Sequence, residues 1–447
     1  MNAKIITTNE HGEFTQRPIF KSSPLAGVCV AKKRQEIATD NFLGFGVAVT
    51  GSSCYNLSLM KKEERRNLLE KLYTNKGLGF NISRLSIGAS DYSAEIYSYD
   101  DVENDIELKH FSIKRDMRYI IPIIKEIIEI NPEIKFFASP WSPPGWMKTG
   151  GSMGGGYMRR KYLDCYADYF VKFIEAYKEQ GIDIHAVTLQ NEPETSQSGR
   201  MTACIWHPEL EAEFAIILKE KFDDKGLKTK IWFYDHNFNG VNRIMWCLDE
   251  YPKLASSLDG IAFHYYEGSV ESTKIIKEKY PSLSLNFTEG GPRLFDNYAT
   301  DWCKWGLMML KALVCGYTSF TGWNLMLDET GGPNVGPFYC GGLVTRNSQS
   351  GDISFSGQYK AFAHIASYVN EDSEFFALDI DGQQDELFIY NGKKGFSVMG
   401  LLVKNNDNEV LVFVNPSDNK AQLQYKKDEN YYIELLPKTI ATIIFED

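Results

Sequence analysis

The sequence predicts an α/β protein in which a (β/α)8 barrel carries an appended antiparallel β-sandwich built from both chain ends. Three observations predict this fold class. Short apolar runs alternate with helical patterns through the middle of the chain, strand patterns alone follow residue 369, and the first 38 residues are polar and β-like. We therefore place sandwich strands at 1–38, the barrel at 39–368 and the rest of the sandwich at 369–447.

Eight short runs are the predicted barrel strands. Each is apolar and rich in β-branched or aromatic residues, as expected of strands that are buried on both faces. They lie at 44–50, 82–87, 135–139, 185–190, 230–234, 260–264, 284–288 and 319–323. Eight strands over about 320 residues have the spacing of a (β/α)8, or TIM, barrel with insertions. A doubly wound sheet is the alternative, but the GxGxxG turn that would favour it does not follow the first run.

Amphipathic helical patterns lie between these runs. In 115–130, isoleucines recur on one helix face. The same periodicity returns at 162–180 and 209–225, where Gly181 and Gly226 stand in the place of a C-terminal cap. Helices of this kind, placed between buried strands, are what a parallel barrel requires.

The pattern changes after residue 369, where six runs predict strands with no room for helices between them. Turn-forming clusters such as Asn391-Gly392 separate these runs. The runs lie at 386–390, 396–403, 410–415, 421–425, 431–435 and 439–445. This is the pattern of an antiparallel sandwich, and we expect the first 38 residues to add strands to it.

Composition and charge exclude several classes of partner. The 48 basic and 59 acidic side chains give a net charge of −11 with no basic run, so neither nucleic acid nor an anionic membrane is expected as the main partner. The stretch 305–327 has one charge, Lys311, and is long enough to cross a bilayer. Its glycines and polar residues favour a helix followed by a buried strand, so we predict no transmembrane segment.

The sequence shows neither an N-terminal secretory signal nor a metal-binding motif. The first residues, MNAKIITTNEHGEF, contain no apolar segment, so we expect a cytoplasmic protein, with specialised export without a cleaved signal as the alternative. Eight scattered cysteines form no CxxC pair, and seven histidines show neither HExxH nor HxH spacing. We therefore predict no metal site and no cofactor.

The residues that follow the predicted strands indicate the chemistry, because function in such a barrel lies at the carboxyl ends of the strands. Glu192 follows the fourth strand and Glu289 the seventh. The other ends present aromatic, amide, imidazole and carboxylate groups: Asp91, Tyr92, Trp141, Asp235, His236, Asn237, Tyr265, Tyr266 and Trp323. Two carboxylates on either side of a bond are what glycoside hydrolysis needs. A lone glutamate at a strand end is often merely solvated, so the prediction rests on the pair.

The segments around these residues resemble the glucosylceramidase family, glycoside hydrolase family 30. The resemblance covers the whole barrel in order, and its most specific parts are SPWSPPGWMKTGGSM and TGWNLMLDETGGPN. The matching segments are FLGFGVAVT from Phe42, SPWSPPGWMKTGGSM at 139–153, LQNEPE at 189–194, FHYY at 263–266, FTEGG at 287–291, TGWNLMLDETGGPN at 321–334 and SGQYKAFAHIASYV at 356–369.

The resemblance implies a role for each site residue. Glu192 resembles the family acid/base and Glu289 its nucleophile, which Arg84 should hold ionised and Tyr266 should orient. Asn191 should bond the sugar 2-hydroxyl. The other expected positions are Trp141 and Trp323 lining the −1 sugar pocket, Asp91, His236 and Asn237 contacting substrate, and Asp235 supporting the rim.

One position departs from the family pattern. Family glucosidases often carry an aspartate in the loop after the first strand, and this chain has Gly51 there. Asp91 or another group must replace that carboxylate, or the preferred sugar differs. We expect a retaining β-glycosidase, a glucosylceramidase or β-glucosidase that acts on a β-linked glycoside or glycolipid by double displacement. A β-fucosidase, β-xylosidase or β-1,6-glucanase is the alternative, and a non-catalytic carbohydrate-binding protein the remote one.

Overall fold

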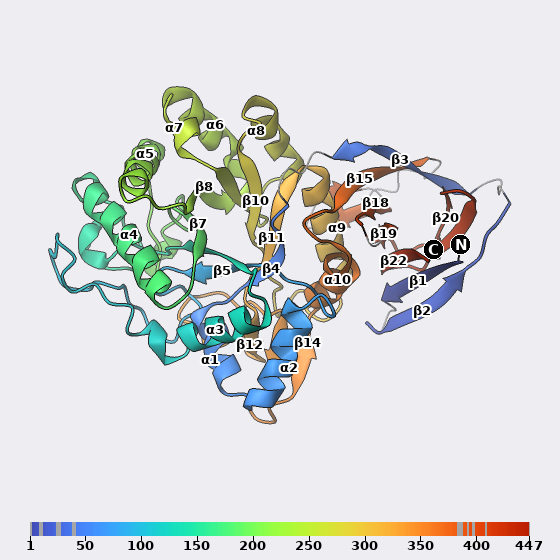
Figure 1. Cartoon of the computed structure of the whole chain (residues 1–447), viewed down its shortest axis with the longest axis horizontal. Helices are drawn as coiled ribbons and strands as arrows, with labels where there is room; N and C mark the ends of the chain where they lie inside the picture. The colour runs from blue at the N-terminus through green and yellow to red at the C-terminus, as the bar shows by residue number, and fades with distance from the viewer. Residues whose placement is uncertain are drawn as a thin grey trace.

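The structure, a computed structural model, describes residues 2–8, 12–23, 28–37, 42–381, 388–390, 393–395, 398–406 and 409–446. A barrel surrounded by helices lies beside a large β-sheet, and both chain termini lie on the sheet (Figure 1). The predicted class, a (β/α)8 barrel with a sheet built from the chain ends, is confirmed.

Eight parallel strands close the barrel in the order β10-β11-β4-β5-β6-β7-β8-β9. Each coincides with one predicted run, and the ends differ by at most three residues. The strands are β4 (Gly44–Ala48), β5 (Ile82–Ser86), β6 (Lys135–Ser139), β7 (Ile184–Thr188), β8 (Lys230–Asn237), β9 (Gly260–His264), β10 (Ser284–Glu289) and β11 (Tyr317–Gly322). Helices cover the outer faces and side chains fill the interior, which is why strands such as β4, β9 and β11 are buried along their whole length.

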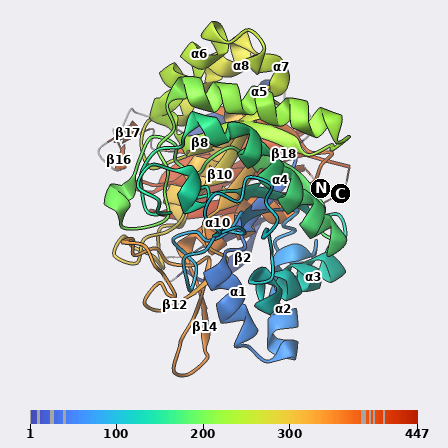
Figure 2. The same ribbon diagram turned by 90° about the vertical axis from the view of Figure 1, so that its left-hand side faces the viewer.

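Helices surround this barrel, and the three predicted amphipathic patterns correspond to α3, α4 and α5. The helices are α1 (Gly51–Ser58), α2 (Lys62–Tyr73), α3 (Ile120–Ile130), α4 (Leu163–Glu179), α5 (Pro208–Asp224), α6 (Val241–Glu250), α7 (Leu254–Ser257), α8 (Lys274–Lys279), α9 (Trp302–Val314) and α10 (Gly357–Ile365). Figure 2 views the molecule from the side on which the barrel lies and shows α4 and α5 in front of the barrel strands. The stretch 305–327 contains most of α9 followed by β11, as predicted. Among the described helices, none has the length and apolar character needed to cross a bilayer.

The second sheet has nine strands in the order β2-β1-β22-β19-β18-β15-β3-β20-β21, and it draws on both chain ends. All neighbours are antiparallel except β3 and β20. The strands are β1 (Asn2–Thr8), β2 (Phe14–Ile19), β3 (Cys29–Ile37), β15 (Glu374–Asp381), β18 (Met399–Lys404), β19 (Glu409–Asn415), β20 (Ala421–Lys426), β21 (Asn430–Leu435) and β22 (Thr439–Glu446). Strand β15 was not predicted. Of the predicted runs, 386–390 and 396–403 fall partly outside the described residues.

The remaining strands form two small sheets. One follows β11, and the other is a hairpin between β15 and β18. Their strands are β12 (Met326–Asp328), β13 (Val344–Arg346), β14 (Ile353–Phe355), β16 (Phe388–Tyr390) and β17 (Lys393–Gly395).

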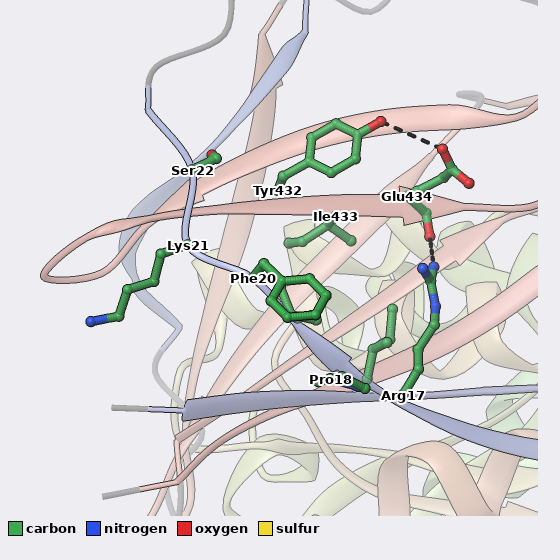
Figure 3. Close-up of a pocket in the computed structure, with 10 residues that line it drawn as sticks. Arg17, Pro18, Phe20, Lys21, Ser22, Tyr432, Ile433 and Glu434 are labelled. Atoms are coloured by element: carbon green, nitrogen blue, oxygen red, sulfur yellow. Dashed lines mark hydrogen bonds between the residues drawn. The ribbon is translucent and has the colours of Figure 1, made fainter.

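The nine-stranded sheet curls until its two edge strands nearly meet, which gives the expected sandwich. A single bridge joins Lys21 to Tyr431. Beyond this bridge β2 and β21 separate, and Figure 3 shows Phe20 in the pocket between them. In the same pocket the Arg17 guanidinium donates a 2.9 Å hydrogen bond to the backbone oxygen of Glu434.

The sheet and barrel share one hydrophobic core. Alternate residues of β19 point to opposite faces: Val410, Val412 and Val414 belong to the barrel-side core, and Leu411 and Phe413 to the interior of the curled sheet. Helices α9 and α10 lie between barrel and sheet (Figure 1). Burial on both faces explains why this strand is almost continuously apolar, and it fixes the two parts of the molecule against each other.

His364 on α10 lies buried in this junction and makes the fold sensitive to acid. Its ring nitrogens lie 2.7 Å from Thr8 Oγ1 and 3.0 Å from Thr442 Oγ1. Burial lowers the pKa of His364 to about 3. In the unfolded chain a histidine has a pKa near 6.5, so below that pH the unfolded state takes up a proton that the folded state excludes.

We predict that between pH 6.5 and pH 5 His364 alone removes about 2 kcal/mol of the free energy of unfolding. Its substitution H364Q keeps an amide able to bond both threonines and should flatten the pH dependence of the thermal midpoint over that range. Thermal unfolding of both proteins at pH 5, 6, 7 and 8 tests this, and parallel pH profiles would contradict it.

Candidate active site

A pocket of about 490 Å³ opens at the carboxyl ends of the barrel strands. Of the predicted site residues, nine line it and Arg84 lies buried beneath it. The nine are Asp91, Trp141, Asn191, Glu192, His236, Asn237, Tyr266, Glu289 and Trp323. Strand-end positions that are far apart in sequence thus converge on one cavity, as the barrel topology requires.

Glu289 ends strand β10 and is held at both carboxylate oxygens. Arg84 Nη1 on β5 lies 2.5 Å from Oε2, and the Tyr266 hydroxyl donates a 2.9 Å hydrogen bond to Oε1. Charge-assisted and neutral donors of this kind favour the ionised form of the carboxyl group and fix its orientation. Both contacts are those the family resemblance implied.

Asp235 is the centre of the buried network below the pocket, which corrects the expectation that it supports the rim. Its side chain is fully buried. It accepts hydrogen bonds of 2.6 to 3.0 Å from Arg84, Ser139, Thr188, His264 and Thr288. Burial alone would raise the pKa of Asp235, but the Arg84 guanidinium and His264 hold it far below its usual value. The carboxylate is therefore a permanent buried negative charge.

Local backbone geometry places this aspartate. Tyr234 and Asp235 both have positive φ, and the pairing of β8 with β9 shifts register between Tyr234 and His236. A bulge of this kind re-aims side chains at a barrel rim. It turns Asp235 into the barrel while His236 and Asn237 still reach the pocket.

Glu192 follows β7 in the left-handed region, with φ of 51°. Its Oε2 accepts a 3.0 Å hydrogen bond from Gln197, and its Oε1 lies 3.4 Å from Nδ1 of His264. Burial alone would raise the pKa of Glu192, but the imidazole of His264, whose Nδ1 lies 3.4 Å away, and then that of His236 lower it to about 2.

His264 was missed by the sequence reasoning, although it lies in the FHYY segment at the end of β9. It is fully buried between three carboxylates, with Nε2 3.0 Å from Asp235 and 3.9 Å from Glu289. Burial alone would lower the pKa of His264, but Glu289, Asp235 and Glu192 raise it to about 9. The electrostatics of this cluster therefore favour a proton on His264 over one on Glu192.

The two proposed catalytic carboxylates are close together. Oxygens of Glu192 and Glu289 and a ring nitrogen of His264 lie within 4.8 Å of one another. These three groups could in principle ligate a metal ion, but the Arg84 guanidinium already supplies a positive charge against Glu289.

Two tryptophans form the inner wall. The rings of Trp141 and Trp323 stack with centroids 5.2 Å apart and planes 19° apart. The Arg84 guanidinium lies 4.7 Å from the Trp141 ring, and its Nη2 donates a 2.8 Å hydrogen bond to Oδ1 of Asn191. Aromatic faces beside polar side chains suit the mixed apolar and hydroxyl surface of a sugar ring.

Asp91 lines the pocket, and its chain neighbours Tyr92 and Ser93 pack against Gly51. The three atoms nearest to a Cβ built on Gly51 belong to Tyr92 and Ser93, at ordinary contact distance. Burial raises the pKa of Asp91 well above its usual value, and the carboxylates of Glu289 and Glu192 add to the rise. One of its oxygens is buried without a hydrogen-bond partner. Asp91 is thus an unsatisfied polar group that faces the pocket.

A closed parallel barrel with two glutamates, a guanidinium and stacked indoles at the carboxyl ends of its strands defines a glycoside hydrolase. The model of the glycosyl hydrolase family 30 TIM-barrel domain matches residues 42–369, and the chain belongs to that family.

Relatives within the family differ in activity. The chain is 28% identical to putative glucosylceramidase 4 of Caenorhabditis elegans, over 99% of this chain and 89% of the relative. It is 29% identical to an endo-1,6-β-D-glucanase of Neurospora crassa, over 73% of this chain and 69% of that protein. A solved endo-β1,6-glucanase structure superposes with a TM-score of 0.85 at 29% identity, covering 100% of this chain and 99% of that one.

We predict that D235N lowers the free energy of unfolding by about 3 kcal/mol, because it leaves Arg84 buried without its fully buried counter-ion. The milder change S139A removes one neutral donor to the same carboxylate and the acceptor of Arg84 Nε, and should cost about 1 to 2 kcal/mol. Denaturant unfolding of the three proteins measures both effects. An equal or smaller loss for D235N than for S139A would refute the central role of Asp235.

Proposed function

We propose that the protein is a retaining β-glycosidase with Glu289 as nucleophile and Glu192 as acid/base. The observation that carries the proposal is that one carboxylate oxygen of Glu192 and one of Glu289 lie within 4.8 Å of each other. Retaining enzymes hold their two carboxyl groups roughly 5–5.5 Å apart, whereas inverting enzymes leave about 6.5–9.5 Å for a water molecule. The short separation supports direct attack on the sugar by Glu289.

In the first step a Glu289 oxygen attacks the anomeric carbon, and the bond from that carbon to the leaving oxygen breaks. Glu192 gives its proton to the leaving oxygen. Arg84 and Tyr266 hold Glu289 in line for the attack, and Asn191 contacts the 2-hydroxyl. In the second step Glu192 takes a proton from water, the resulting hydroxide attacks the same carbon, and the ester bond to Glu289 breaks.

His264 supplies the proton that this cycle requires. Before substrate binds, the electrostatics favour the proton on His264, whose Nδ1 lies 3.4 Å from Oε1 of Glu192. A bound aglycone displaces water from Glu192 and favours its neutral form, so the proton passes from Nδ1 to the carboxylate. When Glu289 becomes an ester its charge disappears, and a neutral His264 then becomes stable. In the second step the proton that Glu192 takes from water restores the proton of the Glu192–His264 pair.

The substrate class proposed first is a β-glucoside of the glucosylceramidase type, in line with the full-length similarity to a putative glucosylceramidase. A β-1,6-glucanase is the second candidate, and the full-length match to a solved endo-β1,6-glucanase favours it. Both bind a β-linked glucosyl unit beside the tryptophans. Asp91, next to Gly51, is our candidate for the carboxylate that binds its distal hydroxyls.

We predict that E289Q lowers kcat on 4-nitrophenyl β-glucoside by roughly 10⁴-fold while the protein remains folded, because the amide is a poor nucleophile. The wild-type enzyme should release β-glucose first, which proton NMR of the early product detects. Release of the α-anomer, or near wild-type turnover by E289Q, would overturn the proposal. Turnover of 4-nitrophenyl β-fucoside and β-xyloside, measured in parallel, tests the alternative substrates.

We also predict that H264Q shifts the alkaline limb of the kcat/KM profile by about one pH unit or more toward acid. The reason is that the wild-type Glu192–His264 pair keeps its proton up to the pKa of His264, about 9. Without the imidazole, Glu192 alone must hold the proton. A lower rate with an unmoved limb would indicate a purely structural role for His264.

A further inference from the structure

Two histidine rings approach the same oxygen of Glu192. Nδ1 of His264 lies 3.4 Å from Oε1, and Nε2 of His236 lies 3.8 Å from the same atom. The second nitrogen of each ring contacts a carboxylate. Nε2 of His264 is 3.0 Å from Asp235, and Nδ1 of His236 is 3.1 Å from Glu194. Two imidazole–carboxylate dyads thus converge on one oxygen, and the proposed proton cycle uses only the dyad of His264.

The two dyads differ in their access to the pocket. The side chains of His264 and Asp235 are fully buried. Those of His236 and Glu194 are 11% and 35% exposed, and both residues line the pocket. The second dyad therefore lies at the pocket wall, where it can be altered without removing a member of the buried network below.

Glu194 is held in a fixed orientation. The Tyr234 hydroxyl donates a 2.5 Å hydrogen bond to Oε2, the oxygen that also faces His236. A Cβ on residue 240 would lie 1.8 Å from this hydroxyl, so Gly240 makes room for it. Burial alone would raise the pKa of Glu194, but the hydrogen bonds from His236 and Tyr234 lower it. Glu194 is therefore an ionised and oriented acceptor.

An ionised Glu194 determines which nitrogen of His236 carries the hydrogen. A carboxylate only accepts hydrogen bonds, so the hydrogen of the neutral ring is on Nδ1. Nε2 is then the nitrogen that faces Glu192. It can accept a hydrogen bond from neutral Glu192 or, once protonated, donate one to ionised Glu192. His236 can thus support Glu192 in both of its catalytic states.

We propose that Glu194 is a positioning residue for the acid/base, and that it acts by holding His236 with Nε2 toward Glu192. This inference rests on the proposed function, in which Glu192 gives and takes the proton. Glu194 itself touches neither the sugar nor the leaving group. Its carboxylate orients the imidazole, and the imidazole orients Glu192, as carboxylate–histidine pairs do in other catalytic sites.

The charges around this dyad give the direction of its effect on pH dependence. Besides Glu192, the titratable groups packed around it are Tyr234 and Asp235 on β8, His264 on β9, Glu211 on α5 and Arg243 on α6. Glu211 and Arg243 form an ion pair with each other, so their charges oppose one another at the dyad. The negative charge of Glu194 favours retention of the proton shared by the neighbouring groups. Its removal makes that proton easier to lose.

The first test compares two leaving groups in E194A and E194Q. We expect E194A to lower kcat/KM roughly thirtyfold on phenyl β-glucoside but only about threefold on 4-nitrophenyl β-glucoside, whose leaving oxygen needs less protonation. E194Q keeps an acceptor for Nδ1 and should recover part of the loss. Near-UV circular dichroism checks that each variant is folded. Equal losses on both substrates would indicate a merely structural role and contradict the proposal.

The second test follows the alkaline limb of the kcat/KM profile. E194Q should move the limb by about half a pH unit toward acid, because one negative charge near the shared proton is lost. E267Q is the matched control. It removes a carboxylate from the same pocket that bonds Asn239 and is exposed, so solvent should screen its effect. Equal shifts in E194Q and E267Q would overturn the proposal.

A double variant tests whether Glu194 acts through His236. In an H236Q background, E194Q should leave the alkaline limb where H236Q alone places it, because the imidazole that transmits the effect is absent. A shift that persists in this background would show that Glu194 acts without His236 and would contradict the assignment.

The last test does not depend on turnover. The chain has seven histidines, so nitrogen NMR of protein labelled in histidine can resolve the rings, and H236Q identifies the signal of His236. At a pH where this ring is neutral, we expect its hydrogen on Nδ1 in the wild type and on Nε2, toward Glu192, in E194A. An unchanged tautomer in E194A would refute the proposal. The expected change in a protein that cleaves no glucoside would support the positioning of His236 and reject the proposed catalysis.

Discussion

The buried ion pair between Arg84 and Asp235 is the interaction on which the site depends. Both side chains are fully excluded from solvent. Such a pair is stable only when the remaining lone pairs and protons are satisfied. The groups that satisfy it come from six consecutive barrel strands: Arg84 from β5, Ser139 from β6, Thr188 from β7, Asp235 from β8, His264 from β9, and Thr288 with Glu289 from β10. The network that orders the charges therefore also fixes the strand ends in register.

The same network sets the electrostatics of the pocket floor. Arg84 contacts the carboxylates of Asp235 and Glu289, and His264 lies among those two carboxylates and that of Glu192. The excess negative charge suits a sugar that develops positive charge at its anomeric carbon. Because the charges are buried and already hydrogen-bonded, little reorganisation is needed when that charge appears. The resting state and the state able to protonate a leaving group then differ only in whether one proton is on His264 or on Glu192.

The sequence allowed most of this architecture to be predicted, and the exceptions have physical reasons. The barrel strands were predictable because burial on both faces makes them apolar, and Glu192 and Glu289 because parallel strands end at one mouth. Asp235 was assigned to the rim because the β8 pattern gives no sign of the bulge that turns it inward.

Other features carried weaker signals or none. His264 ends an apolar run and was passed over, although the strand-end rule that found Glu289 applies equally to it. Gln197 and Glu194 lie on loops whose conformation is set by tertiary contacts, so no periodicity marks them. Strand β15 mixes buried and half-buried positions without a regular period, so it was overlooked beside the stronger runs that follow it.

The strand order of the large sheet has a consequence for synthesis in the cell. Strand β1 pairs with β22, and β3 pairs with β15 and β20, so the first strands made have partners that are made last. At roughly 5–20 residues per second, translation separates β1 from β22 by roughly 20–90 seconds. During that interval the nascent chain carries strands with unpaired edges beside a barrel whose last helices still await their covering sheet. The N-terminal strands of the sheet can therefore pair fully only after its C-terminal strands have been made.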